Sequence, residues 1–285
     1  MPAEPAMLTG LGLEWEYWMM RGEFERAWEV SDRILGAVAP RLDEVRGKRV
    51  LVRCEHGLGD TIQYIRYAPL LRPLVARLLV HAQPRLLPLL RGMTAIDHLF
   101  TWGEEWPNGQ YDVEIEIMDL PHLFRTTLDS IPGEVPYLAV DGGAAPDGHD
   151  SGRLRLGVQC CCGDWDPNKA LPAETRSAPR EVPGVEVVDL EQGLATPDVA
   201  ATAAAVLATD LVIAPDTMVA HLAGALGRPV WVLLPYEANW RWMLDRDDSP
   251  WYRTMRLFRQ DAGRQWLRPL ERVLAELRRI APEGG

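Results

Sequence analysis

The sequence predicts an α/β protein whose strands form parallel sheets in two domains. Short apolar runs alternate along the chain with segments in which apolar residues have helical spacing. The chain has 285 residues, of which 47% are hydrophobic, so it can fill the cores of two ordinary domains. The segment 131–152 is rich in Gly, Pro and Asp and indicates a linker between the domains.

The composition excludes several classes of function. A formal net charge of −11 argues against nucleic acid or an anionic membrane as the main partner, because no broad basic surface would attract either. No apolar run approaches the length of a membrane span, and the N-terminus lacks the pattern of a secretory signal. Of the four cysteines, three are consecutive, so they do not form a disulfide framework. We expect a cytoplasmic protein.

Residues 1–46 predict a helical hairpin. Two segments of helical spacing within 7–39 meet at Gly22, where a small residue allows a turn. Gly22, Phe24 and Ala27 resemble the turn and the start of the second helix in one tetratricopeptide unit. Because a single unit cannot bury its own apolar face, it must pack on the rest of the chain or on a partner. The alternative is a plain hairpin that caps a domain.

The first domain, 47–140, opens with a strand, the loop EHGLGD and a helix over 61–71. Gly57 and Gly59 allow a tight backbone and the close approach of a ligand. The loop is neither a dinucleotide fingerprint nor a Walker loop, because it has two glycines and no Gly-Lys-Ser/Thr ending. Asp60 stands between loop and helix, where it either caps the helix or presents a general base to a cleft.

Further α/β units follow in this domain. The segment 111–117 alternates apolar residues with glutamates and predicts a half-exposed edge strand. The expected strands are Lys48–Cys54, Arg77–His81, His98–Trp102 and Tyr111–Ile117, and the expected helices are Thr61–Leu71, Arg85–Leu90 and Leu120–Phe124.

The second domain, 154–285, follows a linker at 141–153 and repeats the same alternation. It ends in an amphipathic helix with its leucines on one side. The expected strands are Leu154–Cys160, Val185–Leu190, Leu211–Ala214, Val230–Leu234 and Met255–Arg259; the expected helices are Ala173–Glu181, Pro197–Ala208, one after Thr217, and Trp266–Ile280.

The stretch 211–235 reads as strand, helix and strand, and is a candidate anion site. Asp216 and Thr217 can each cap the helix, and Gly227 ends it. A helix N-terminus at the carboxyl edge of a parallel sheet favours phosphate, and His221 lies one turn into the helix. Such units also occur without a ligand, so the pattern leaves both possibilities open.

Two unusual segments flank this unit. Cys160, Cys161 and Cys162 point in alternate directions if they end a strand, which favours a small-residue pocket wall over a metal site. Further on lie Trp240, Trp242 and Trp251 with Arg241. These aromatic residues either pack on the domain below or line a cleft where they stack on a sugar or base, with Arg241 near a phosphate.

Four motifs resemble, in the same order, those of a known family. They are GLGDTIQYIRYAPLL, IPGEVPYL, DLVIAPDTMVAHLAGALGRPVWVLLP and NWRWMLDRDDSPWYRTMRLFRQ. Residues 48–275 thereby resemble the glycosyltransferase module of bacterial tetratricopeptide-linked glycosyltransferases, which are related to the lipopolysaccharide (ADP-heptose) heptosyltransferases. Residues 8–39 resemble the repeat before this module. The resemblance implies two Rossmann-like domains facing across a cleft, the glycosyltransferase B fold, with the donor mostly on the C-terminal domain.

The resemblance also implies roles for individual residues. Asp60 matches the family's proposed general base, and Asp216, Thr217 and His221 match the motif that holds the donor diphosphate at a helix N-terminus. Lys169 is the nearest match to a basic residue that meets the diphosphate. The remaining residues expected at the site are Met218 beside the diphosphate and Gly57, Leu58, Gly59, Trp240 and Arg241 in the cleft loops.

The implied reaction is an inverting transfer from a nucleotide-diphosphate sugar to an acceptor hydroxyl or other nucleophile, without metal or cofactor. The acceptor would be a glycan, a protein or a small molecule. The chain departs from the family at Gln159–Cys162, in the acidic loop GDWDPNKA, at Lys169–Ala170 and at Pro215. These departures keep two alternatives open: a non-catalytic or repurposed member that binds a nucleotide or a protein partner, and an enzyme of the same fold that does not transfer sugar.

Overall fold

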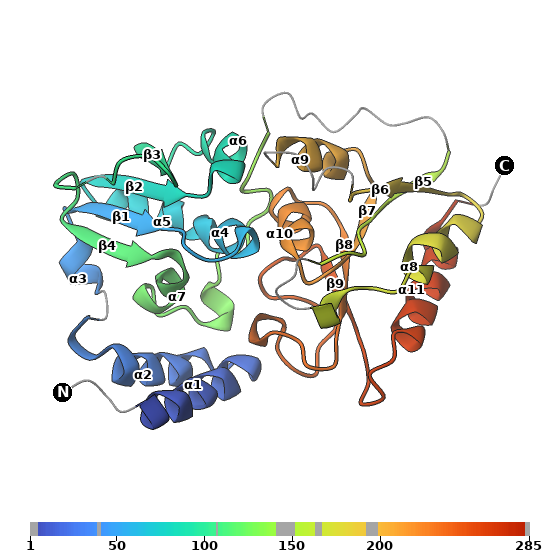
Figure 1. Ribbon diagram of the computed structural model, residues 1–285, viewed down its shortest axis with the longest axis horizontal. Helices are drawn as coiled ribbons and strands as arrows, with labels where there is room; N and C mark the ends of the chain where they lie inside the picture. Colours follow the sequence, from blue (N-terminus) through green and yellow to red (C-terminus); the bar gives the residue numbers. More distant parts are fainter. Residues whose placement is uncertain are drawn as a thin grey trace.

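The computed structural model describes residues 5–38, 41–106, 108–140, 152–162, 167–191 and 199–282. It contains two parallel sheets, as the sequence predicts, with the orders β3-β2-β1-β4 and β6-β5-β7-β8-β9 (Figure 1). The first sheet comprises β1 (Arg49–Arg53), β2 (Arg77–Ala82), β3 (His98–Thr101) and β4 (Val113–Glu116). The second comprises β5 (Leu154–Val158), β6 (Val185–Asp189), β7 (Leu211–Pro215), β8 (Val230–Leu234) and β9 (Met255–Arg259).

Burial along the strands follows their place in each sheet. Every residue of β7 and β8 is buried, which fits their continuous apolar runs at the centre of a covered parallel sheet. β4 is an edge strand in which only Ile115 is fully buried, so the half-exposed edge expected at this position is confirmed. β1 is central, pairing with β2 on one side and β4 on the other.

Most connections between the strands are helical. Around the first sheet lie α3 (Leu42–Val45), α4 (Leu58–Tyr64), α5 (Ala68–Leu71), α6 (Leu87–Leu90), η5 (Ile117–Asp119) and α7 (Leu120–Leu123). Around the second lie α8 (Glu174–Ser177), α9 (Ala200–Leu207), α10 (Met218–Ala225), η10 (Trp240–Trp242) and α11 (Leu267–Ile280). Residues 141–151, which hold most of the predicted linker, lie outside the described part of the chain.

The helix expected over 61–71 begins earlier and is broken. α4 begins at Leu58 because Gly57 takes the extended backbone of an N-cap, and it ends at Tyr64. A short 3-10 turn and then α5 replace its second half. Pro69 has no backbone N–H to donate to the carbonyl of Ile65, so a continuous α-helix is disfavoured at this position. Asp60 therefore lies inside the first turn of the helix.

Two N-terminal helices pack against the first sheet's side of the molecule. α1 (Pro5–Met20) and α2 (Phe24–Leu35) run side by side and meet at Gly22, whose φ is +76° (Figure 1). The buried indole of Trp28 donates a 2.7 Å hydrogen bond to the carbonyl of Thr126. α1 also contacts η10, so these helices touch both halves of the chain. Among the described residues, none of the helices is both long and apolar enough for a bilayer span.

The relationship that places the candidate site is the packing of α4 on α10. α4 follows the carboxyl end of β1, and α10 follows the carboxyl end of β7. The two helices face each other in the middle of the molecule (Figure 1). The carboxyl ends of two parallel sheets thus supply residues to one place, which is where ligands bind in folds of this class.

Candidate functional site

Asp60 uses its two carboxylate oxygens for different partners. Oδ2 accepts a 3.0 Å hydrogen bond from the backbone N–H of Gly57 and so caps the start of α4. Oδ1 lies 2.6 Å from Nη2 of Arg241, on the other half of the chain. The side chain is 20% exposed. The capping interpretation of Asp60 is therefore confirmed for one oxygen, while the other faces the candidate site.

Arg241 is the centre of the charged network. Its side chain is 9% exposed and donates to Asp60, to Oε1 of Gln63 at 2.9 Å and to Oδ1 of Asn239 at 3.0 Å. Burial opposes the charge, but the nearby carboxylates of Asp60 and Asp216 help to raise the pKa of Arg241 above its ordinary value. The guanidinium thus remains charged, and it is held in place at both ends of its fork.

Asp216 is the second carboxylate of the site. It follows β7, its side chain is 6% exposed, and its Oδ2 accepts a 2.8 Å hydrogen bond from Nζ of Lys169. Oδ1 lies 3.6 Å from Nε2 of His221. Burial alone would raise the pKa of Asp216, but His221, Arg241 and Lys169 together hold it well below its ordinary value. Asp216 is therefore ionised at neutral pH.

His221 bridges the two carboxylate pairs as a neutral group. Burial is the main cause that lowers the pKa of His221. Nε2 lies 3.4 Å from Nη1 of Arg241 and 3.6 Å from Oδ1 of Asp216, so it faces both a donor and an acceptor. Nδ1 lies 3.0 Å from the hydroxyl of Tyr252. The ring stacks on Trp242 with centroids 5.5 Å apart, which holds its plane.

The start of α10 has the geometry of an anion site. Thr217 is the N-cap, but its hydroxyl donates to Oε1 of Gln159 at 2.6 Å instead of accepting a helix N–H. Asp216, the other predicted cap, is bound to Lys169. Within the described residues, no side chain therefore caps the first amides of α10, which include that of Met218. The expectation of a side-chain cap was wrong, because both side chains have partners outside the helix.

Gly59 sets how closely the two halves approach. A Cβ atom at this position would lie 2.8 Å from Cδ2 of His221, closer than real Cβ contacts allow. Gly59 therefore permits α4 to touch α10. The close approach of a ligand, which the sequence suggested for this glycine, stays a prediction. Leu58 and Gly57 lie beside it in the first turn of α4 and at its N-cap.

Five of the predicted residues thus form one charged cluster. Its members, called the charged cluster below, are Asp60, Lys169, Asp216, His221 and Arg241. Two carboxylates and two cations alternate around a neutral imidazole, so the cluster has no net charge.

The aromatic segment divides between core and surface. Trp242 and Trp251 are fully buried, and the indole N–H of Trp251 donates to the carbonyl of Arg241 at 3.0 Å, so both pack as core. Trp240 is half-buried and packs edge-on against Trp15, with centroids 5.0 Å apart. The guanidinium of Arg241 is bound to Asp60 in this structure, and its expected contact with a phosphate stays a prediction.

One glutamate side chain binds the backbone of two of the cysteines. The backbone N–H groups of Cys160 and Cys161 both donate to Oε1 of Glu191, at 2.9 and 2.8 Å, which shapes the end of β5. Burial raises the pKa of the Cys160 thiol to about 11. In the ranges given above for the structure, no group of three or more His, Cys, Asp or Glu is arranged to hold a metal ion.

Four residues of the site were not predicted from the sequence. Gln63 stands three residues after Asp60, so helical spacing could have indicated that both share a face. Gln159, at the end of β5, binds Thr217, and Asn239 and Tyr252 orient Arg241 and His221. The last two lie on irregular segments, where no periodic signal exists.

The fold of the chain is similar to that of several solved structures. The chain has a TM-score of 0.55 and 16% identity with ADP-heptose lipopolysaccharide heptosyltransferase II of E. coli, over 82% of this chain and 98% of that one. The fold is heptosyltransferase-like. A family 9 glycosyl transferase from Veillonella parvula has a TM-score of 0.52 at 15% identity, covering 76% of this chain and 87% of that one.

A third similar structure is the E. coli heptosyltransferase WaaC with ADP-2-deoxy-2-fluoro heptose. Its TM-score is 0.52 at 11% identity, over 80% of this chain and 99% of that one. No protein-family model and no curated protein matches the chain. At these identities the likeness extends to the fold.

Proposed function

We propose that the protein is an inverting, metal-independent glycosyltransferase that uses a nucleotide-diphosphate sugar. The observation that carries the proposal is the charged cluster, in which Asp60 from one sheet meets Asp216, His221 and the open start of α10 from the other. A base on one side and phosphate-binding groups on the other are what such a transfer needs. The heptosyltransferase-like fold supports the same reaction class.

Each group has a role in the proposed step. Asp60 takes the proton of the acceptor nucleophile as that atom bonds to the anomeric carbon of the sugar. The bond from this carbon to the diphosphate oxygen breaks, and its electron pair stays on the leaving diphosphate. Attack opposite to the leaving group inverts the anomeric configuration. Lys169, Arg241 and the first amides of α10 stabilise the charge on the diphosphate.

The ion pair between Arg241 and Asp60 favours an order in which the donor binds before Asp60 acts as the base. While Oδ1 of Asp60 accepts from Arg241, the guanidinium engages one of the lone pairs that could take the proton of the acceptor. A bound diphosphate competes with both carboxylates of the cluster for the two cations. We infer that donor binding draws Arg241 from Asp60 and Lys169 from Asp216, so that the base becomes free when the donor is in place.

The same ion pair favours one alternative function. If Arg241 does not leave Asp60, the protein is a non-catalytic member of the fold that binds a nucleotide or a protein partner. Two further features favour the non-catalytic function: the sequence before Lys169 is acidic, and Lys169 is paired with Asp216. Both reduce the positive charge that is free to bind a diphosphate.

A donor panel separates the two functions. ADP-, UDP-, GDP- and dTDP-sugars are tested by thermal shift, followed by donor hydrolysis in the wild type and in Asp60→Asn. A ligand at 100 times its dissociation constant adds about 2.7 kcal/mol of stability, which for a chain of this size shifts Tm by about 5 °C or more. A shift with Asp60-dependent hydrolysis supports the transferase, a shift without hydrolysis supports the binding protein, and no shift contradicts both nucleotide-binding functions.

A further inference from the structure

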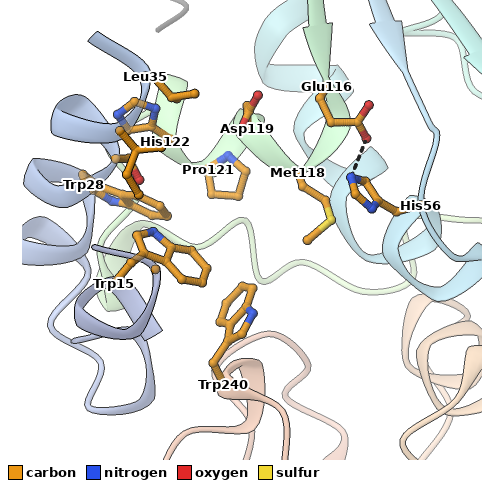
Figure 2. A pocket seen from close by; sticks show the side chains of 13 residues that line it. Trp15, Trp28, Leu35, His56, Glu116, Met118, Asp119, Pro121, His122 and Trp240 are labelled. Carbon is orange, nitrogen blue, oxygen red and sulfur yellow. Dashed lines mark ion pairs between the residues drawn. The ribbon is translucent and has the colours of Figure 1, made fainter. Parts of the chain in front are cut away.

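A second candidate site lies beside the charged cluster, between the N-terminal helices and the first sheet. It is a cavity of about 320 Å³, at the small end of the range for ligand pockets. Its walls come from α1, α2, the η5–α7 segment, the loop before α4 and η10 (Figure 2). Trp240 in its wall is the chain neighbour of Arg241, so the cavity and the charged cluster share η10.

One side of the cavity is aromatic. Trp15 and Trp240 contact each other edge-on, and Trp28 lies further along the same wall (Figure 2). The N–H of Trp28 is already bound to a backbone carbonyl, so this indole offers the cavity its ring and not a donor. Indole faces attract cations through the ring quadrupole, and they also stack on sugar rings.

The other side carries two carboxylates. The side chain of Glu116 is 14% exposed, and both its oxygens are buried without a hydrogen-bond partner among the described residues. Nε2 of the exposed His56 lies 3.7 Å from Oε1 of Glu116. Burial raises the pKa of Glu116 to about 7 and also raises the pKa of Asp119. A buried carboxylate without a cation is costly, so a positive ligand would be stabilised here.

A buried histidine adds a free acceptor to the same wall. His122 is 3% exposed, and its Nε2 lies 2.9 Å from Oδ1 of Asp32, which also binds Arg125. If Nε2 donates to this carboxylate, the neutral ring keeps a lone pair on Nδ1. That atom is buried and has no partner among the described residues. The cavity is therefore lined by three residues that carry hydrogen-bond acceptors, Glu116, Asp119 and His122.

We propose that this cavity binds a small organic cation, a primary ammonium or guanidinium carried on one ring or one short chain, as part of the sugar acceptor. The assignment to the acceptor rests on the proposed transferase function, while the binding of the cation does not. A neutral sugar would stack equally well on the indoles but would leave the carboxylates uncompensated. The N-terminal helices, which supply two of the three indoles, then complete the acceptor site.

The first test measures binding without any nucleotide sugar. Glucosamine, glucose and agmatine are titrated calorimetrically at pH 7 into the full chain. We expect glucosamine or agmatine to bind at least ten times more tightly than glucose. Tighter glucosamine binding indicates an amino-sugar acceptor, and tighter agmatine binding indicates a guanidinium on a flexible chain. If neither cation binds, or if glucose binds as tightly, the proposal is wrong.

The second test uses variants. Glu116→Gln combined with Asp119→Asn should weaken binding of the cation at least tenfold, while the exposed control Asp129→Asn should not change it. Trp15→Leu keeps both carboxylates and should also weaken binding of the cation. It replaces the double variant in this test if the double variant fails to fold. Unchanged affinity in a folded cavity variant overturns the proposal. Cation binding without any response to nucleotide sugars would support the cavity proposal and contradict the transferase function. A response to nucleotide sugars without cation binding would support the transferase function and contradict the cavity proposal.

Discussion

The carboxylate of Asp60 and the guanidinium of Arg241 form a 2.6 Å ion pair between residues 181 positions apart. This pair ties the first turn of α4 to η10, across the contact between α4 and α10. It also occupies the oxygen that a general base would use. The same contact therefore joins the two halves of the site, and in the proposed reaction a diphosphate competes for Arg241 and releases Asp60.

Replacing Asp60 by Asn separates chemistry from binding. The amide can still accept from the N–H of Gly57, but it cannot take a proton from the acceptor. We expect turnover and donor hydrolysis to fall at least 10³-fold, within the range that general bases contribute, while the donor binds at least as tightly, because its diphosphate no longer competes with a charged Asp60 for Arg241. Steady-state kinetics and isothermal titration with the donor measure the two quantities. Loss of donor binding in a folded variant would contradict the assignment of Asp60 as the base.

Replacing Arg241 by Gln should affect both stability and activity. The guanidinium has three side-chain partners besides His221, and its removal leaves Asp60 without its cation. We expect a loss of about 3 kcal/mol of unfolding free energy, measured by urea denaturation, together with weaker donor binding. Arg246→Gln is a matched control, because Arg246 pairs with the largely exposed Asp248. Equal stability losses in the two variants would argue against a central role for Arg241.

Lys169 can be followed directly, because the chain has only two lysines, Lys48 and Lys169. Lys48 is exposed, whereas Lys169 is partly buried against Asp216. Lys169→Gln should weaken donor binding about tenfold, and Lys48→Gln should not. In the wild type, a bound donor should slow acylation of Lys169 selectively, as read by peptide mass spectrometry. Equal protection of both lysines, or of neither, would contradict the proposed diphosphate contact.

Gly59→Ala tests the close approach of α4 and α10. The new methyl group would meet Cδ2 of His221 at 2.8 Å, so α4 and α10 must move apart. We expect kcat to fall at least tenfold with a modest loss of stability, because the base and the diphosphate site move apart. Gly92→Ala is the control, since a Cβ there meets nothing within 4 Å. Wild-type kcat in Gly59→Ala would show that this contact does not matter for the reaction.

Because Glu116 is buried, we expect the free energy of unfolding to depend on pH. Burial raises its pKa from 4.5 to about 7, so the folded state holds more protons than the unfolded chain between these values. Stability is therefore lost as pH rises from about 4.5 to 7, although Arg53 and His56 attract the ionised form and Glu55 repels it.

The variant Glu116→Gln removes the cost of burying an ionised carboxylate at this position. At pH 8 it should be more stable than the wild type by about 3 kcal/mol, and at pH 4 the two should be alike. Thermal melts at both pH values measure this, with the exposed Glu105→Gln as control. A destabilised Glu116→Gln at pH 8 would show that the carboxylate has a cationic partner in the free protein.

Most elements of the fold were predictable because their signals are local. The strands after residues 210 and 229 lie where apolar runs end at a proline, and the helix before Gly227 ends where a residue with φ of +75° is needed. The helix predicted over 61–71 was only partly right, because Pro69 breaks the hydrogen-bond ladder in a segment whose apolar spacing continues.

The five members of the charged cluster could be predicted from the sequence, but their pairing could not. Asp60, Lys169, Asp216, His221 and Arg241 could each be named from motifs and a family resemblance. Which cation binds which carboxylate depends on the distance between segments far apart in the chain, and no sequence period encodes this distance. The cavity lined by Trp15, Glu116 and Trp240 was missed for the same reason.

By itself, then, the sequence determined the α/β class, the strand and helix segments and the residues able to do acid–base and phosphate chemistry, because these depend on periodicity and side-chain type. Only the tertiary structure decided that Arg241 closes on Asp60, that Lys169 closes on Asp216, and that the N-terminal helices meet Glu116 across an aromatic cavity. The physical reason is that charge pairing and burial are properties of atoms brought together by packing, and packing joins residues that the chain keeps apart.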